Sequence, residues 1–392
     1  MTSRNDAHPE IGILALVGHR WLPQWQVPHQ VLSRLSRRFH VVWVNPAHEW
    51  RRILHEAKRM IASTNGHPAP TGMDVYTPGP FVPLVHRPSW LASGLFRARL
   101  WSARRRLTRR GCKTVILSVW RPVYGDALRL TRYDLSCYYI DDEFTFSSVE
   151  KPVSDEETTI LRSVDQVFIA SPQMLRKKGS LNRNTAWSPN GVAYAEFATP
   201  CPEPTDIASI RRPRLGYSGY IKKQVDWSLL LSLATRHPDW QFVFVGKQSG
   251  HPEIAETLTR LSKLDNVHFL GSKSIAEMAK YPQHFDVCLM PYCVDDYTKY
   301  IDPLKLHEYL ASGQPVVGSN IPALDKFRGV VAVATSVDEW SSAISKALEA
   351  SERTPERRKV RQTTAREYDW DVLVGKIAST LLERLEEKGR DS

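Results

Sequence analysis

The chain has 392 residues, which is more than one ordinary hydrophobic core holds, so the length predicts two domains. Its 42% hydrophobic and 24% charged residues are typical of a folded protein and exclude a disordered one, and no apolar run approaches the roughly 18 residues of a membrane span. The net charge of +11 is uneven, because residues 1–140 hold 21 Lys and Arg against 7 Asp and Glu, whereas residues 201–392 hold 26 of each. The basic first part predicts an anionic partner, such as a membrane surface, a nucleic acid or a phosphorylated substrate.

Two further features of the composition indicate the compartment. The first ten residues contain no apolar segment of the kind that a secretory signal needs. The five cysteines have no CxxC spacing, which argues against structural zinc and against a disulfide framework. Both features fit a reducing cytosol, so we expect a cytoplasmic protein.

Short apolar runs alternate with helical stretches along the chain. In the first half the predicted strands are 11–17, 41–45, 114–119, 136–140 and 166–170. In the second half they are 215–218, 241–245, 267–270, 286–290, 315–318 and 330–334. Because these runs are almost continuously apolar, we expect strands that are buried on both faces, as in parallel sheets. The alternation predicts an α/β fold with two doubly wound, Rossmann-like domains that face a cleft and bind ligands beyond the carboxyl ends of their strands.

The proline-rich segment 201–206 is the best candidate linker. It divides the chain into a basic first domain, 1–205, and a second domain, 206–365. Residues 366–392 predict an amphipathic helix with three apolar residues on one face: Trp370, Leu373 and Ile377. Two alternatives remain for this helix, because it either packs back on the first domain or simply ends the second.

An acidic cluster follows one predicted strand of the first domain. Asp141, Asp142 and Glu143 come directly after the run 136–140. A carboxylate at a strand end can orient or deprotonate a hydroxyl of an acceptor, so Asp141 and Asp142 are the candidate catalytic residues. The cluster and the pair Asp295-Asp296 also leave a metal site as a less favoured alternative.

The tract Phe81–Arg110 mixes large apolar side chains with arginines. This mixture fits an amphipathic helix that lies on anionic lipid. The alternative is an ordinary core helix with a solvated arginine face.

A short helix is predicted near residue 303 of the second domain. Asp302 suits the N-cap, Pro303 the first helical position and Gly313 the end of the helix. Lys305 and Glu308 are three residues apart and share a face. A lysine in the first turn of a helix suits a phosphate group, and a carboxylate one turn later suits sugar hydroxyls. The alternative is a solvated Lys-Glu pair on an amphipathic helix.

Two strand ends of the second domain add to this candidate site. Gly219 follows the run 215–218, and Lys222 and Lys223 come shortly after it. A glycine at a strand end lets backbone amides approach a phosphate, and the lysines supply positive charge. Tyr292 follows the run 286–290 and leads, through a loop, into the helix near residue 303. We expect these strand ends and the helix N-terminus to converge on one ligand.

Five segments of the second half occur in an order that resembles the donor-binding domain of the GT-B-fold glycosyltransferases, in particular the large family four. They are LGYSG (215–219), WQFVFVG (240–246), NVHFLG (266–271), FDVCLMPY (285–292) and PLKLHEYLASGQPVV (303–317). In the first half, DQVFIAS (165–171) and SPNGV (188–192) resemble the end of the acceptor domain. WVNP (43–46) and YYIDDE (138–143) resemble the branch that builds teichuronic acid and other cell-envelope glycans.

The resemblance implies roles for individual residues. Glu308 matches the second glutamate of the family's Glu-x(7)-Glu motif, which holds the nucleotide ribose, whereas Tyr300 stands in place of the first. Tyr220 and Asp226 stand where the pyrophosphate-binding arginine and lysine are usual. The compensating cations are then Lys222, Lys223 and above all Lys305.

Two more positions belong to the donor site by the same resemblance. Leu306 lies within the matched motif, and the loop at Gly18 contributes backbone amides near the donor phosphate in GT-B enzymes. The alternative for Gly18 is an ordinary turn between a strand and a helix.

The resemblance implies a retaining, metal-independent glycosyltransferase that needs no cofactor beyond its nucleotide-diphospho-sugar donor. Its acceptor would be a glycan, a lipid-linked glycan or a small molecule of cell-envelope or exopolysaccharide synthesis. Such an enzyme would act in the cytoplasm, peripherally at the inner face of the membrane. The alternatives are a nucleotide-sugar epimerase on the same fold, or a basic protein that binds nucleic acid, for which no recognisable motif is present.

Overall fold

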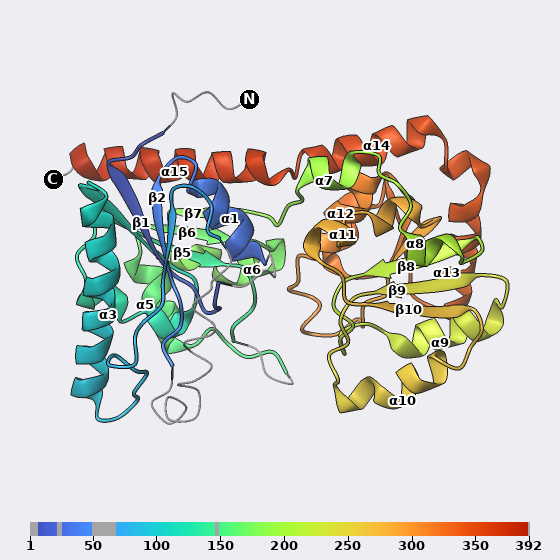
Figure 1. Cartoon of the computed structure of the whole chain (residues 1–392), viewed down its shortest axis with the longest axis horizontal. Helices are drawn as coiled ribbons and strands as arrows, with labels where there is room; N and C mark the ends of the chain where they lie inside the picture. The colour runs from blue at the N-terminus through green and yellow to red at the C-terminus, as the bar shows by residue number, and fades with distance from the viewer. Residues whose placement is uncertain (1–6, 22–25, 49–67, 146–148, 391–392) are drawn as a thin grey trace. The chain divides into compact units, whose positions relative to one another are not determined.

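The computed structural model describes residues 7–21, 26–48, 68–145 and 149–390 (Figure 1). The chain divides into two compact units. The first unit comprises Met1–Ser188 and Leu373–Ser392, and the second comprises Pro189–Val372. None of the helices in the described part of the chain combines the length and the apolar character that a membrane span requires.

The first unit is built on a parallel sheet with the strand order β3-β2-β1-β4-β5-β6-β7. Its strands are β1 (Ile11–Leu16), β2 (His40–Val44), β3 (Met73–Tyr76), β4 (Thr114–Val119), β5 (Leu135–Ile140), β6 (Gln166–Ile169) and β7 (Thr185–Trp187). Its helices include α1 (Val27–Leu35), α3 (Ser89–Arg109), α4 (Ala127–Leu130), α5 (Asp155–Ser163) and α6 (Pro172–Lys178). The five predicted strands are confirmed, whereas the outer strands β3 and β7 were not predicted.

Helix α3 packs against β1 and β2 along one side of this sheet (Figure 1). Gly12 of β1 permits the close approach, because a Cβ atom there would lie 2.8 Å from Cδ2 of Leu107. At the sheet edge, Arg106 Nη1 lies 2.9 Å from Asp74 Oδ1 of β3. The helix is therefore held by its apolar side and by one ion pair.

The second unit is also built on a parallel sheet, with the strand order β10-β9-β8-β11-β12-β13. Its strands are β8 (Arg214–Ser218), β9 (Gln241–Val245), β10 (Val267–Gly271), β11 (Val287–Met290), β12 (Val316–Ser319) and β13 (Val331–Ala334). Its helices include α7 (Tyr194–Ala198), α8 (Thr205–Ala208), α9 (Trp227–Arg236), α10 (Pro252–Leu261), α11 (Ile275–Met278), α12 (Leu304–Ser312), α13 (Val337–Leu348) and α14 (Pro355–Arg366). All six predicted strands are confirmed.

Successive residues of the strands in the second unit pack on opposite faces of its sheet. Phe242 and Phe244 of β9 belong to the cluster with α9, α10 and α13, whereas Val243 and Val245 belong to the cluster with α12 and α14. Side chains alternate across a strand, so a sheet that is covered on both sides needs apolar residues at every position. The continuous apolar runs of the sequence have this cause.

The boundary between the units lies earlier than the predicted linker, 201–206. Val192 pairs with Asp369, and Ile207 is fully buried in the core of the second unit. The Tyr281 hydroxyl donates to Asp206 Oδ1 at 2.8 Å. The proline-rich segment therefore belongs to the second unit, and the first of the two stretches that form the first unit ends at Ser188.

The last helix, α15 (Trp370–Arg390), begins in the second unit and continues in the first from Leu373 onward. Trp370, Leu373 and Ile377 are buried, as their shared face predicts. Lys388 Nζ lies 2.8 Å from Asp165 Oδ2 in the first unit. The last turns of the chain are thus fixed by an ion pair to residues more than two hundred positions earlier.

Candidate functional site

Helix α12 runs from Leu304 to Ser312 and ends at Gly313, whose φ of 78° is the left-handed cap that favours glycine. The predicted N-cap at Asp302 is wrong, because Pro303 occupies the cap position and no side chain caps the helix. The Asp302 carboxylate instead accepts a hydrogen bond from the Asn190 backbone N–H at 2.7 Å, and the Asn190 side chain donates to the Asp302 carbonyl at 2.6 Å. Asp302 therefore fixes the Asn-Gly-Val turn to the start of α12.

The first turn of α12 lies against the carboxyl end of β8. The Tyr309 hydroxyl accepts a hydrogen bond from the Ser218 N–H at 2.8 Å, which ties the helix to the strand end. Lys305 extends over the same strand end, and its Nζ lies 5.0 Å from the centroid of the Tyr217 ring. The structure thus brings together β8 and the helix N-terminus, as the sequence predicts.

Gly219 leaves the space that the Lys305 ammonium occupies. A Cβ atom at position 219 would collide with Nζ and Cε of Lys305, and the φ of Gly219 is 128°. Its N–H donates to the Val245 carbonyl at 2.7 Å, and a side chain at Gly246 would collide with the Gly219 carbonyl. The ends of β8 and β9 and the side chain of Lys305 are therefore packed closely enough to require glycine here.

Glu308 follows Lys305 on the same face of α12 and is half-buried. Burial raises the pKa of the Glu308 carboxyl, Lys305 lowers it and Glu196 raises it. A cation and, one turn later, a carboxylate thus stand beside a strand end and a helix N-terminus. This arrangement can hold an anionic group near Lys305 and a pair of hydroxyls near Glu308.

The other predicted donor-site residues differ in their surroundings. Tyr292 follows β11, which neighbours β8, and is 4% exposed. Lys222 is half-buried, whereas Lys223 is exposed and its Nζ lies 3.6 Å from Glu253 Oε2. Leu306 is fully buried in the core below α12, so we remove its side chain from the candidate site.

The structure gives local roles to residues that depart from the family pattern. The Asp226 carboxylate accepts a hydrogen bond from the Leu229 N–H at 2.9 Å and caps α9. Tyr300 is 4% exposed, whereas Tyr220 is 48% exposed. Position 226 therefore serves the helix, and position 300 is part of the packing.

In the first unit, three neighbouring strands end at a cluster around Arg121. Arg121 Nη1 lies 2.6 Å from Asp141 Oδ1, and Arg121 Nη2 lies 2.9 Å from His19 Nε2. A Cβ atom at Gly18 would lie 2.7 Å from Arg121 Cγ, so Gly18 provides room for this side chain. Burial and the Arg121 charge lower the pKa of His19, and Asp141 raises it. Sequence reasoning missed Arg121, although its position just after a predicted strand was a usable signal.

The acidic cluster of the first unit is therefore divided. Asp141 is 8% exposed and pairs with Arg121, while Asp142 accepts a hydrogen bond from the Glu143 N–H at 2.8 Å. Glu143 is buried and pairs with Lys178 at 2.8 Å. Within the described residues, no group of three or more His, Cys, Asp and Glu side chains is arranged to hold a metal ion.

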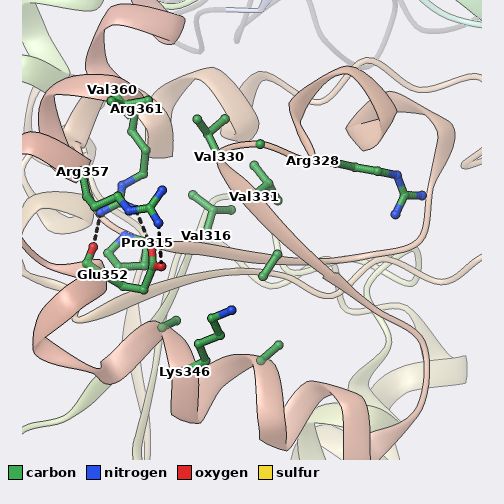
Figure 2. Close-up of a pocket in the computed structure, with 14 residues that line it drawn as sticks. Pro315, Val316, Arg328, Val330, Val331, Lys346, Glu352, Arg357, Val360 and Arg361 are labelled. Carbon is green, nitrogen blue, oxygen red and sulfur yellow. Dashed lines mark hydrogen bonds and ion pairs between the residues drawn. The ribbon is translucent and has the colours of Figure 1, made fainter.

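A cavity of about 340 Å³ lies in the second unit at the amino ends of β12 and β13 (Figure 2). Its lining includes the apolar Val316 and Val331 as well as Arg357 and Arg361. Both arginines pair with Glu352, at 3.4 Å and 3.7 Å. The cavity contains none of the predicted site residues, which lie at the carboxyl ends of the strands.

Comparison with known proteins finds similarity in the part of the chain that contains the candidate site of the second unit. Residues 212–350, which contain Gly219, Lys305 and Glu308, match the family model described as glycosyl transferases group 1. The chain is also similar to TuaH of Bacillus subtilis strain 168, which is named as a teichuronic acid biosynthesis glycosyltransferase. The two are 29% identical over 184 residues, which cover 45% of this chain and 46% of TuaH. The match thus spans about half the length of the curated relative.

Solved structures match almost the whole chain. A glycosyltransferase from Rickettsia africae ESF-5 matches with a TM-score of 0.67 and 12% identity, over 97% of this chain and 99% of that one. The fold is that of the GT-B glycosyltransferases. The Escherichia coli trehalose-6-phosphate protein bound with UDP-2-fluoro glucose matches this GT-B chain with a TM-score of 0.64 and 13% identity, over 95% and 98% of the two chains. At these identities the likeness is one of fold.

Proposed function

We propose that the chain is a glycosyltransferase that moves a sugar from a nucleotide-diphospho-sugar to a glycan, lipid-linked or small-molecule acceptor in cell-envelope or exopolysaccharide synthesis. The observation that carries the proposal is the position of Lys305, whose ammonium lies between Gly219 and the Tyr217 ring at a helix N-terminus. The matched family model and the name of TuaH support glycosyl transfer in envelope synthesis. The UDP-sugar in the Escherichia coli structure supports the donor class.

In the proposed reaction Lys305 and the first N–H groups of α12 stabilise the charge that develops on the leaving diphosphate. Glu308 accepts hydrogen bonds from the ribose hydroxyls and fixes the nucleotide. The leaving phosphate itself takes the proton of the acceptor hydroxyl, so transfer with retention requires neither a metal nor a cofactor. Gly219, Lys222 and Tyr292 complete the donor site.

For the first unit we propose that Asp141 acts through Arg121. Its carboxylate already accepts a hydrogen bond from that guanidinium at 2.6 Å, so its Oδ1 is engaged within the protein. Asp141 then orients Arg121 and His19 at the strand ends, where an acceptor is recognised. Asp142 remains the candidate group for contact with an acceptor hydroxyl.

Transfer to a lipid-linked acceptor places the enzyme in the cytoplasm, at the inner face of the membrane. The basic first unit favours an anionic membrane surface over a neutral one. The matches named above favour glycosyl transfer over the epimerase and nucleic-acid alternatives.

The test is nucleotide binding by calorimetry with UDP, GDP and dTDP, followed by product analysis with the matching labelled sugar donor. Lys305→Ala should weaken the tightest of the three, and Lys263→Ala, an exposed lysine of the same unit, should not. If no nucleoside diphosphate binds the unmodified chain, the proposal fails. If the labelled donor is converted to an epimeric nucleotide sugar without transfer, the epimerase alternative holds.

A further inference from the structure

We infer that the exposed face of α3 docks on a bilayer that contains anionic lipids. We call this face the α3 stripe and define it by Trp90, Gly94, Arg97, Trp101 and Arg105, all of which are exposed. Their spacing of three or four residues places them on one side of the helix. The inference rests on the proposed function only in that a lipid-linked acceptor makes such docking useful.

The α3 stripe lies opposite the side by which the helix is held to the sheet. The buried residues of α3 are Arg99, Leu100, Ala103 and Leu107, and the helix packs against β1, β2 and α4. On the other side, the side chains of Trp90 and Trp101 are 73% and 61% exposed. An ordinary surface helix has polar residues on its outer face, so two exposed tryptophans there need a partner.

The charge around the α3 stripe has one sign. Residues 75–125 contain ten Lys and Arg and no Asp or Glu. Arg99 is buried and Arg106 pairs with Asp74, so these two do not contribute to the outer face. Arg97 and Arg105 do contribute, and the Arg105 guanidinium lies 5.1 Å from the centroid of the Trp101 ring.

Tryptophan and arginine together on one helix face suit the interface of a bilayer. The indole ring has an apolar body and a polar N–H, and it partitions to the level of the lipid headgroups. Arginines beside it attract anionic headgroups, each contributing roughly a fivefold gain in binding. Helix α3 is 21 residues long, enough to present this stripe flat against a surface. A nucleic-acid duplex would be attracted by the arginines alone and would not require the exposed indole rings.

The experiment is flotation of the full chain with vesicles of phosphatidylcholine alone or mixed with phosphatidylglycerol. We expect binding to the mixed vesicles only, and weaker binding at higher salt. Arg97→Gln with Arg105→Gln should lower the partition coefficient onto the mixed vesicles about 25-fold, because each lost arginine lowers binding about fivefold. Trp90→Ala with Trp101→Ala should lower it about tenfold or more, since each ring loses apolar burial in the interface.

The matched control is Lys359→Gln with Arg366→Gln, two exposed cations of α14 in the second unit, which should bind vesicles like the unmodified chain. Nucleotide affinity, measured in the same preparations, should be unchanged in all three double variants. The inference is overturned if the unmodified chain fails to float with anionic vesicles. It is also overturned if both α3 variants float as well as the unmodified chain. Tight binding of an oligonucleotide that depends on the arginines but not on the tryptophans, without vesicle binding, would assign the stripe to nucleic acid. Failure of nucleotide binding would refute the proposed function and leave the vesicle result standing.

Discussion

Gly219→Ala tests whether the Lys305 ammonium is positioned by the strand end of β8. A methyl group at position 219 would occupy the place of Lys305 Nζ and Cε, and the lysine is flexible enough to move away. The backbone conformation, with φ of 128°, also disfavours any residue with a side chain. The substitution should therefore weaken binding of a nucleoside diphosphate and lower the free energy of unfolding.

The magnitudes follow from the two contributions. A charge-assisted hydrogen bond from Lys305 to a phosphate contributes about 1.5–3 kcal/mol, so Lys305→Ala should weaken binding by roughly 10-fold to 150-fold. Displacing the ammonium without removing it should cost about half of that free energy. In the Lys305→Ala background there is no ammonium to displace, so Gly219→Ala should change the affinity little. The coupling free energy between the two positions should then be about 1 kcal/mol.

The assay is a double-mutant cycle in which calorimetry measures affinity for the tightest nucleoside diphosphate, and thermal denaturation measures stability. Gly250→Ala is the matched control, because Gly250 also has a positive φ, 68°, but a Cβ atom there meets no atom within 4 Å. It should lower stability by about 1–2 kcal/mol and leave the nucleotide affinity unchanged. Additive effects of Gly219→Ala and Lys305→Ala, or an equal loss of affinity in Gly250→Ala, would show that the glycine does not position the lysine.

Glu308→Gln should weaken the binding of UDP about tenfold or more and the binding of 2′-deoxy-UDP much less, because the charged hydrogen bonds from the ribose hydroxyls to the carboxylate are lost. Equal losses of affinity for both nucleotides, measured by calorimetry, would show that Glu308 does not contact the ribose. Burial raises the pKa of Asp302 to about 7, above its ordinary 3.8, so its stabilising contribution is present below pH 3.8 and is lost as the pH rises through 7. Asp302→Asn should make the free energy of unfolding depend less on pH in this range. The same pH dependence in the variant and the unmodified chain, measured by chemical denaturation at several pH values, would contradict that assignment. Lys178→Met should lower the free energy of unfolding by about 3–5 kcal/mol, because it removes the buried cation that lies between the Glu143 and Glu157 carboxylates; a denaturation midpoint close to that of the unmodified chain would refute this.

Eleven strands were predictable because each is a largely apolar run, and central strands such as β1, β9 and β11 are buried on both faces of their sheet. The two that were missed lie at the edges of the first sheet, where one side of the strand has no neighbour and the apolar signal is weak. In β3, Asp74 serves the ion pair to Arg106, and β7 has only three residues. The edge strands β10 and β13 were predicted from their apolar residues, whereas β3 and β7 depend on tertiary contacts that their short sequences do not carry.

The candidate site was predictable where one helix turn defines it. Lys305 and Glu308 share a face because of their spacing, and the structure keeps them there. Asp302 shows the limit, since an acidic residue before a proline suits a helix cap, yet it is held by Asn190, which is 112 positions away in sequence. Arg121 shows the same limit, because its partners His19 and Asp141 come from two other strand ends.

The departures from the family pattern have a common consequence. At position 226 the carboxylate caps α9, and a lysine there would lose the hydrogen bond to the Leu229 N–H and face the positive end of the helix dipole. The helix therefore favours Asp226 on stability alone, so under the proposed function another residue would supply the cation for the diphosphate. Lys305 is the lysine placed for that role, since Gly219 leaves room for its ammonium and the Tyr217 ring supports it. Under the proposed function, phosphate recognition would rest on the first turn of α12 and not on the loop after β8. Because Glu308 lies next to that turn, one helix would position both halves of the proposed nucleotide site.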